Sequence, residues 1–233
     1  MGTLVLVMLG NGVVANVVLK KTLGENSGWL VICTGYGLAV MAGVLTAIAC
    51  GSSDAHINPA VTLGMAIAQG DFSKLATYVP AQLLGAMVGA ILVWLHYMPH
   101  WSVTPDKGSK LACFCTGPAI PSMGSNIFSE TLGTFALVFI IGCIFSKSVS
   151  LAGPAPAMGP FLVGLTVWLI GLCLGGTTGF AINPARDLGP RIMHQLLPIS
   201  GKGDSNWGYA MVPVVGGIVG GILAGAFIKT FVQ

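Results

Sequence analysis

The tripeptide Asn-Pro-Ala occurs twice, at Asn58-Pro59-Ala60 and at Asn183-Pro184-Ala185, and its residues suit the recognition of a small polar molecule. An Asn before a helix is a preferred N-cap, because its side-chain oxygen accepts hydrogen bonds from helix amides while its NH2 group remains a donor. Proline at the first helical position has no N–H to lose. Each helix start also carries roughly half a positive charge. Two such sites facing one space predict a region that donates hydrogen bonds to neutral solutes and repels cations.

The composition around these tripeptides is that of an integral membrane protein. Of the 233 residues, 54% are hydrophobic and 7% are charged, and the mean hydropathy is +0.86. A soluble domain has about 25% charged residues, so this chain lacks the means to cover a water-facing surface. A net charge of +3 is too small to indicate nucleic acid as a partner. The six cysteines lack metal-ligand spacing and no nucleophile–base pair can be assembled. We therefore expect no bound metal, no cofactor and no enzymatic activity.

Six apolar stretches are long enough to cross a bilayer, since a spanning helix needs about 20 residues. Two more, 59–68 and 184–197, are about half as long and begin within the tripeptides. Half-length apolar helices behind a polar break predict re-entrant segments. The predicted spans are 1–19, 29–49, 76–98, 127–145, 157–174 and 209–232.

The chain also contains an internal repeat. Residues 2–7 match 133–138, and residues 83–89 match 214–220, both at an offset of 131 (133 − 2 and 214 − 83). Each half holds three spans, an odd number, so the second half must enter the membrane from the opposite side. We predict one channel domain over 1–233, made of a first half at 1–100 with a re-entrant loop at 51–69, a connecting loop at 101–124, and a second half at 125–233 with a re-entrant loop at 176–197.

The residues around both tripeptides resemble the major intrinsic protein family, the aquaporins and glycerol facilitators. The resemblance rests on residues 55–62 and 178–190 and extends over essentially the whole chain. It implies an all-α membrane protein with six transmembrane helices plus two re-entrant half-helices, one pore per protomer, a homotetramer, and a multi-pass location in the cell membrane. Asp187, Arg191 and Pro213 favour the glycerol facilitator (aquaglyceroporin) branch, because strict water channels usually carry a small residue where Asp187 stands.

The resemblance places the selectivity filter at four residues: Tyr36, Gly171, Phe180 and Arg186. Facilitators usually carry Trp at the first of these positions, and water-selective members usually carry His where Gly171 stands, so a glycine implies a wider passage. Arg186 offers several donors and keeps its charge. An arginine at membrane depth costs roughly 2.5–3.5 kcal/mol even on a lenient scale, so we expect it to face a cavity. Tyr36 and Phe180 would face the carbon side of a polyol.

The re-entrant loops are expected to line the passage with backbone carbonyls, because exposed backbone at membrane depth is tolerated only where it lines water. Glu130 is expected to accept hydrogen bonds from loop amides, with a proton relay as the alternative, and its equivalent in the first half would precede Met1. Asp187 is expected to support the second loop. The predicted lining carbonyls belong to Asp54, Ala55, His56 and Ile57, and to Gly179, Phe180, Ala181 and Ile182.

These features predict a passive channel for glycerol, water and other small uncharged solutes, with undissociated small hydroxy acids such as lactic acid as a further candidate. The two helix starts and Arg186 would exclude protons, and the cost of dehydration would exclude the anions of such acids. The alternative is a proton-coupled secondary transporter, which can share the inverted repeat but needs a titratable relay; Glu130 is the one clear span carboxylate.

With the N-terminus in the cytoplasm, as the resemblance implies, most loop lysines would lie outside, against the positive-inside rule. Charge alone therefore leaves the orientation open.

Overall fold

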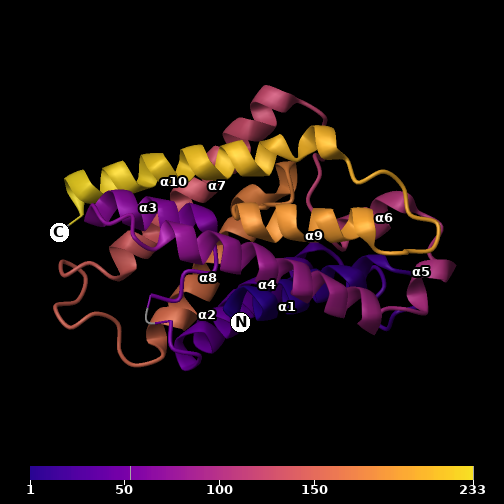
Figure 1. Cartoon of the computed structure of the whole chain (residues 1–233), viewed down its shortest axis with the longest axis horizontal. Helices are drawn as coiled ribbons and strands as arrows, with labels where there is room; N and C mark the ends of the chain where they lie inside the picture. Colours follow the sequence, from indigo (N-terminus) through magenta and orange to yellow (C-terminus); the bar gives the residue numbers. More distant parts are fainter. Residues whose placement is uncertain (53, 233) are drawn as a thin grey trace.

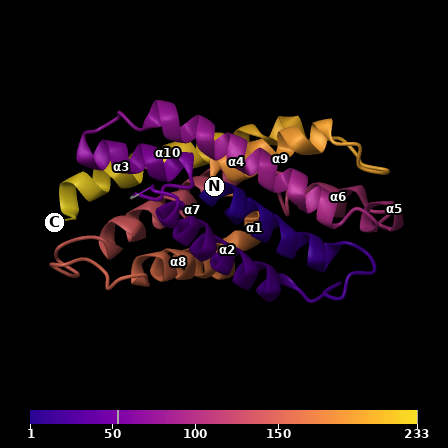
Figure 2. The same cartoon turned by 60° about the horizontal axis from the view of Figure 1, so that its bottom comes forward.

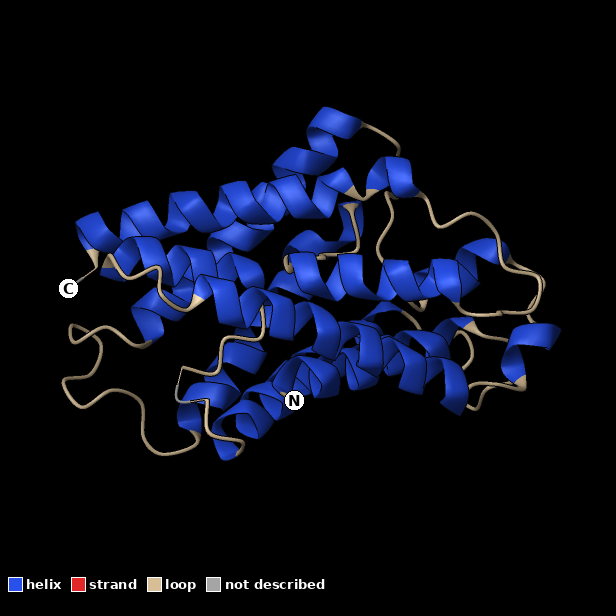
Figure 3. Ribbon diagram, viewed as in Figure 1, coloured by secondary structure: helices blue, strands red, loops and turns tan. Residues whose placement is uncertain are grey.

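The computed structural model describes residues 1–52 and 54–232, and these residues form a bundle of helices that contains no strand (Figures 1 and 3). The long helices run broadly along the longest axis of the molecule, and the N-terminus lies near the middle of that axis in two views (Figures 1 and 2). The helices that are long and apolar enough to cross a membrane are α2 (Trp29–Ala49), α4 (Leu75–His96), α7 (Met123–Ile144), α8 (Met158–Leu174) and α10 (Met211–Phe231).

The sixth predicted span is α1 (Gly2–Val18), an apolar helix of 17 residues. It is shorter than α2, α4, α7 and α10. Helix α8 also has 17 residues, but the additional turn Gly175–Thr177 extends it. Its sequence consists largely of Leu, Val and Gly, and it packs on α2 and α4. The predicted all-α membrane fold is confirmed, with this difference in the length of the first helix.

Two half-length helices occupy the centre of the bundle, namely α3 (Pro59–Gln69) and α9 (Pro184–Leu196). Each begins at the proline of its tripeptide and is capped by the preceding asparagine. The Asn58 side chain accepts from the amide of Ala60, and the Asn183 side chain accepts from the amides of the two residues that follow Pro184. The two helices lie end to end in both views, with α9 toward the short helices α5 and α6 and α3 toward the C-terminus (Figures 1 and 2).

The prediction of α9 as an apolar helix is wrong. Four of its residues are charged or ionisable, and all four are buried: Arg186, Asp187, Arg191 and His194. The helix tolerates two of these charges because they compensate each other, in the ion pair between Arg191 Nη2 and Asp187 Oδ1 at 2.8 Å. A buried charge is acceptable only when it is paired and hydrogen-bonded.

The predicted connecting loop is also more ordered than expected, since it contains α5 (His100–Val103) and α6 (Lys107–Ala112). Asp106 caps α6 by accepting from the amide of Ser109 at 2.7 Å. Two aromatic residues anchor the region in the protein, because Trp101 and Phe114 are buried with ring centroids 5.8 Å apart. Helices this short carry too few turns for an apolar period to reveal them in a sequence.

Two lysines near these short helices serve a structural purpose. Lys202 Nζ donates to three carbonyls at the end of α9, each at 2.7 Å, and Lys110 Nζ donates to the carbonyl of Ser200. Helix ends carry a partial negative charge that favours such a cation. Burial lowers the pKa of both ammonium groups. These lysines are part of the fold, which accounts for some of the positive charge that appeared to conflict with the positive-inside rule.

The two halves interlock through equivalent glycine contacts. A Cβ added to Gly64 of α3 would lie 2.9 Å from the carbonyl oxygen of Gly221 on α10. A Cβ added to Gly189 of α9, the repeat equivalent at an offset of 125 (189 − 64), would lie 3.1 Å from the carbonyl oxygen of Leu83 on α4. Hydrophobic burial does not drive helices together in lipid, so close backbone contact between small residues supplies much of the packing. Each half-helix is thus packed on the last long helix of the other half.

The closest of these contacts yields a prediction about stability. A Cβ on Gly225 of α10 would lie 2.3 Å from the carbonyl oxygen of Gly64, so Gly225→Ala should separate α3 from α10 and destabilise the protein by about 1–3 kcal/mol. Gly12→Ala is the matched control, because a Cβ on that helical glycine meets nothing within 4 Å. Thermal unfolding of the purified variants in detergent measures the effect. Equal melting temperatures for the two variants would contradict the packing argument.

Candidate functional site

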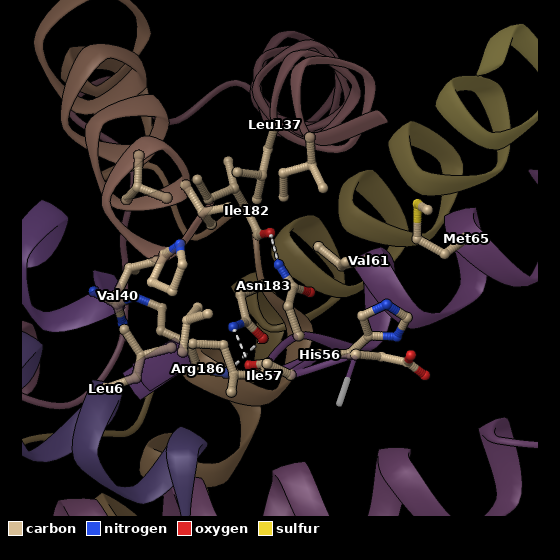
Figure 4. Close-up of a pocket in the computed structure, with 18 of the residues that line it drawn as sticks. Leu6, Val40, His56, Ile57, Val61, Met65, Leu137, Ile182, Asn183 and Arg186 are labelled. Carbon is tan, nitrogen blue, oxygen red and sulfur yellow. Dashed lines mark hydrogen bonds between the residues drawn. The ribbon is translucent and has the colours of Figure 1, made fainter. Parts of the chain in front are cut away.

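A cavity of about 360 Å³ lies at the centre of the bundle, and both re-entrant loops line it (Figure 4). One wall is apolar and comes from α2, α7 and α8, with Val40, Leu137 and Val163 among its residues. The opposite wall is polar and consists of the two loops and the first turns of the half-helices. Its functional side chains are His56, Asn58, Asn183 and Arg186.

The tips of the two loops are joined by a crossed pair of hydrogen bonds. Asn58 Nδ2 donates to the carbonyl oxygen of Ile182 at 2.7 Å, and Asn183 Nδ2 donates to the carbonyl oxygen of Ile57 at 3.0 Å. Figure 4 draws both bonds as dashed lines at the Ile182 and Ile57 carbonyls. The sequence predicted two asparagine donors at one spot but not that each would hold the opposite loop. Each NH2 group has two N–H bonds, so one remains for a molecule in the cavity.

The second loop has an unusual backbone that the sequence did not reveal. Phe180 and Ile182 have positive φ angles of 40° and 42°, and Ala55 of the first loop has a φ of 49°. A positive φ is an outlier for a β-branched residue such as Ile and costs roughly 1–3 kcal/mol. Such a conformation persists only where surrounding contacts enforce it.

Glu130 of α7 provides that enforcement. Its Oε1 accepts from Thr178 Oγ1 at 2.6 Å and from the Ala181 amide at 3.0 Å, and its Oε2 accepts from the Ile182 amide at 2.8 Å. In a trans peptide the N–H and C=O groups point in opposite directions. The carbonyls of Phe180 and Ala181 therefore point away from Glu130, and both residues line the cavity.

The first loop is held by a residue that sequence reasoning missed. Gln82 of α4 is buried, and its Nε2 donates to the carbonyl of His56 at 2.8 Å and to Thr62 Oγ1 at 2.9 Å. The His56 carbonyl, predicted to serve the passage, thus has a protein partner as well. At the mouth of this loop Asp54 forms an ion pair with Lys74. The signal for Gln82 was an amide side chain within an apolar span, a rare and usually functional feature.

Tyr36, Phe180 and Arg186 meet at the end of the cavity nearer α6, and we call these three residues the aromatic–arginine cluster. The rings of Tyr36 and Phe180 are edge-to-face with centroids 5.5 Å apart. The guanidinium carbon of Arg186 lies 4.7 Å from the Tyr36 ring centroid, within the range of a cation–π contact. Arg186 is 5% exposed, and its Nη1 is buried without a hydrogen-bond partner in the protein. Because Nη1 is buried, a molecule in the cavity would be bound by the other N–H groups of Arg186, a residue that lines the cavity.

Gly171 lies behind this cluster. A Cβ at this position would lie 3.1 Å from Phe180 Cζ and 3.1 Å from Cys33 Sγ, so the glycine leaves room for the phenylalanine ring. The carbonyl of Gly171 accepts from Trp29 Nε1 at 3.2 Å, and the Trp29 ring is edge-to-face with Phe180 at 5.5 Å. Trp29 was not among the predicted site residues, because its position at a helix start resembles that of an interfacial aromatic.

Asp187 and Gly179 lie next to a segment of the connecting region. Asp187 Oδ2 accepts from the amide and the hydroxyl of Thr116 at 2.8 and 2.7 Å, and its Oδ1 accepts from Arg191 Nε at 2.9 Å. Arg191 Nη2 in turn donates to the Thr116 carbonyl at 2.9 Å. A Cβ on Gly179 would lie 3.4 Å from Thr116 Cβ. The Asp187 carboxylate is thus occupied by the protein and braces the start of α9.

The geometry agrees with comparisons to known proteins. The major intrinsic protein family model matches residues 1–228. The chain is 54% identical over 224 residues to the probable glycerol uptake facilitator protein of Thermotoga maritima, covering 96% of this chain and 93% of that protein. It is 37% identical over 236 residues to the D/L-lactic acid transporter of Lactiplantibacillus plantarum, covering 99% of this chain and 94% of that protein.

The fold has a close counterpart among solved structures. The X-ray structure of the aquaglyceroporin from Plasmodium falciparum matches with a TM-score of 0.84 at 30% identity, over 99% of this chain and 92% of that chain. The fold that the two tripeptides predicted is therefore confirmed, and the chain belongs to the major intrinsic protein family.

Proposed function

We propose that this protein is a passive channel of the cell membrane for glycerol, water and other small uncharged solutes. The observation that carries the proposal is the central cavity, which is lined by the crossed asparagines and by Arg186. Its relative in Thermotoga maritima is named a probable glycerol uptake facilitator, which supports glycerol as the solute. A polyol has a hydroxylated side and a carbon side, and the cavity has one polar and one apolar wall to match them.

The selectivity residues follow from this proposal. The solute hydroxyls accept from Arg186, Asn58 and Asn183 and donate to loop carbonyls, while the rings of Tyr36 and Phe180 face the solute carbons. Two half-helix starts and one guanidinium group surround the same passage, so a cation meets positive potential throughout. Glu130 and Asp187 support the loops, because their oxygens are bonded to the protein. Glu130 therefore has a structural role that disfavours a proton relay.

Undissociated hydroxy acids of glycerol's size are a second class of solute. The support is the relative from Lactiplantibacillus plantarum that is named a D/L-lactic acid transporter. The neutral acid offers one carboxyl and one hydroxyl group to Arg186 and the asparagines. Its anion would lose most of its hydration on entering a passage with an apolar wall, and moving a charge out of water is costly.

The whole chain acts as one channel domain in this proposal, with the halves 1–100 and 125–233 joined through 101–124, and four chains form the complex. Exposed leucines along α2 support an apolar contact with lipid or with a second chain: Leu30, Leu38 and Leu45.

Family members are channels, and we infer no enzymatic activity. Among residues 1–52 and 54–232, no group of three His, Cys, Asp or Glu side chains is placed to hold a metal ion.

Osmotic assays test the channel function. Proteoliposomes shocked with glycerol should shrink and then reswell much faster than empty liposomes, and a pH-sensitive dye inside them should report no proton movement. The reswelling rate should rise linearly with the glycerol gradient, because a passive pore has no carrier cycle to saturate. Saturable uptake driven by a pH gradient would favour the proton-coupled transporter instead.

The Gly171→Ala variant tests the filter. The added methyl group would press on the Phe180 ring and narrow the passage, so glycerol permeability should fall about three- to tenfold, equivalent to about 0.7–1.4 kcal/mol in the barrier. Water permeability should fall less because water is smaller. Gly176→Ala is the control, since a Cβ there meets nothing within 4 Å. A glycerol-to-water ratio unchanged by Gly171→Ala would show that Phe180 does not limit glycerol.

A further inference from the structure

Asn11 is an amide side chain in the middle of the apolar helix α1, and it is fully buried at 0% exposure. The Tyr36 hydroxyl donates to Asn11 Oδ1 at 2.5 Å. Asn11 Nδ2 then donates to the carbonyl oxygen of Phe114 at 3.0 Å. A buried polar group at membrane depth is expensive unless it is bonded, and here both ends of the amide are bonded. The chain of bonds leads from the aromatic–arginine cluster to the connecting region.

The tyrosine ring is confined from several directions. A Cβ on Gly10 would lie 2.5 Å from Tyr36 Cε1, so the ring lies directly against the backbone of α1. The Phe180 ring and the Arg186 guanidinium contact it from the second loop and α9. Tyr36 lines the central cavity, so a movement of its ring would change the width of the passage.

We propose that Asn11 is a positioning residue that sets the glycerol-to-water selectivity of the channel by holding the Tyr36 hydroxyl against α1 and out of the passage. This inference rests on the proposed channel function. Without the Asn11 acceptor, the phenol hydroxyl has to find another partner, because an unsatisfied buried hydroxyl is costly. The wet cavity beside it offers that partner. The tyrosine then turns toward the cavity and narrows it for glycerol more than for water.

The same bonds make the connecting region part of the filter. Phe114 accepts from Asn11, and Thr116, two residues later, binds the carboxylate of Asp187. Asp187 directly follows Arg186 in α9. Two members of the aromatic–arginine cluster, Tyr36 and Arg186, are therefore both located by one short stretch of backbone. The separation between them depends on that stretch staying in place.

A double-mutant cycle tests the proposal in proteoliposomes, with glycerol and water permeability measured on the same preparations. Asn11→Leu has a similar volume and removes the acceptor, and Tyr36→Phe removes the hydroxyl that needs it. Asn11→Leu should lower the glycerol-to-water ratio at least about fivefold, the equivalent of about 1 kcal/mol. Tyr36→Phe changes a residue of the filter itself, so its own glycerol-to-water ratio is the reference against which the double variant is compared. The double variant should have the same ratio as Tyr36→Phe alone, because no hydroxyl is left to turn inward.

Asn16→Leu is the matched control, because Asn16 lies on the same helix with its side chain against Gly24. It should leave the ratio unchanged. Should Asn11→Leu not fold, Asn11→Ala replaces it in the cycle. A loss of both permeabilities in equal proportion, with no rescue by Tyr36→Phe, would overturn the positioning role and indicate a purely structural one. A wild-type protein that conducts neither solute would instead refute the channel function, and the inference with it.

Discussion

Lipid offers no hydrogen bonds, so every backbone group that leaves regular helix at membrane depth has to be bonded by the protein or by water in a cavity. The arrangement at the centre of this molecule follows from that constraint. Both loop tips are non-helical, and each is completed by the asparagine of the other through Asn58 and Asn183. The inverted repeat makes this arrangement possible, because the N-termini of the two half-helices can meet only when the halves enter the membrane from opposite sides. The remaining loop carbonyls face the cavity, where water or a solute can donate hydrogen bonds to them.

Support for the loops is unequal in the two halves. Glu130 satisfies two amides and one hydroxyl of the second loop, which contains two residues with positive φ outside glycine. In the first loop, Gln82 holds a carbonyl instead. A carboxylate accepts several hydrogen bonds and can enforce a strained backbone, whereas one amide N–H fixes a single carbonyl. The end of the cavity that carries Arg186 is accordingly the more rigidly specified one.

Features that depend on local composition could be predicted from the sequence. The apolar spans, the capped half-helices and the repeat can each be recognised from short stretches of neighbouring residues. Residues such as Asn11, Trp29 and Gln82 could not be placed, because their roles depend on hydrogen-bond partners between 20 and 142 positions away. The positive φ angle of Ile182 could not be predicted either, since β-branched residues rarely adopt one. The charged content of α9 was visible but misjudged, because its compensation comes from Thr116 and residues 205–206.

The crossed asparagines also bear on how the protein is made. Asn58 finds its acceptor 124 positions later in the chain, and Ile57 is bound by a donor 126 positions later. During synthesis the first half enters the membrane while the ribosome has yet to translate the residues that complete its tip. Until Ile182 and Asn183 are synthesised, the polar groups at the tip of the first loop lack these partners. The two loop tips can be joined only when synthesis is well past its midpoint, and a chain that ended before Ile182 would leave the Asn58 amide and the Ile57 carbonyl without these partners.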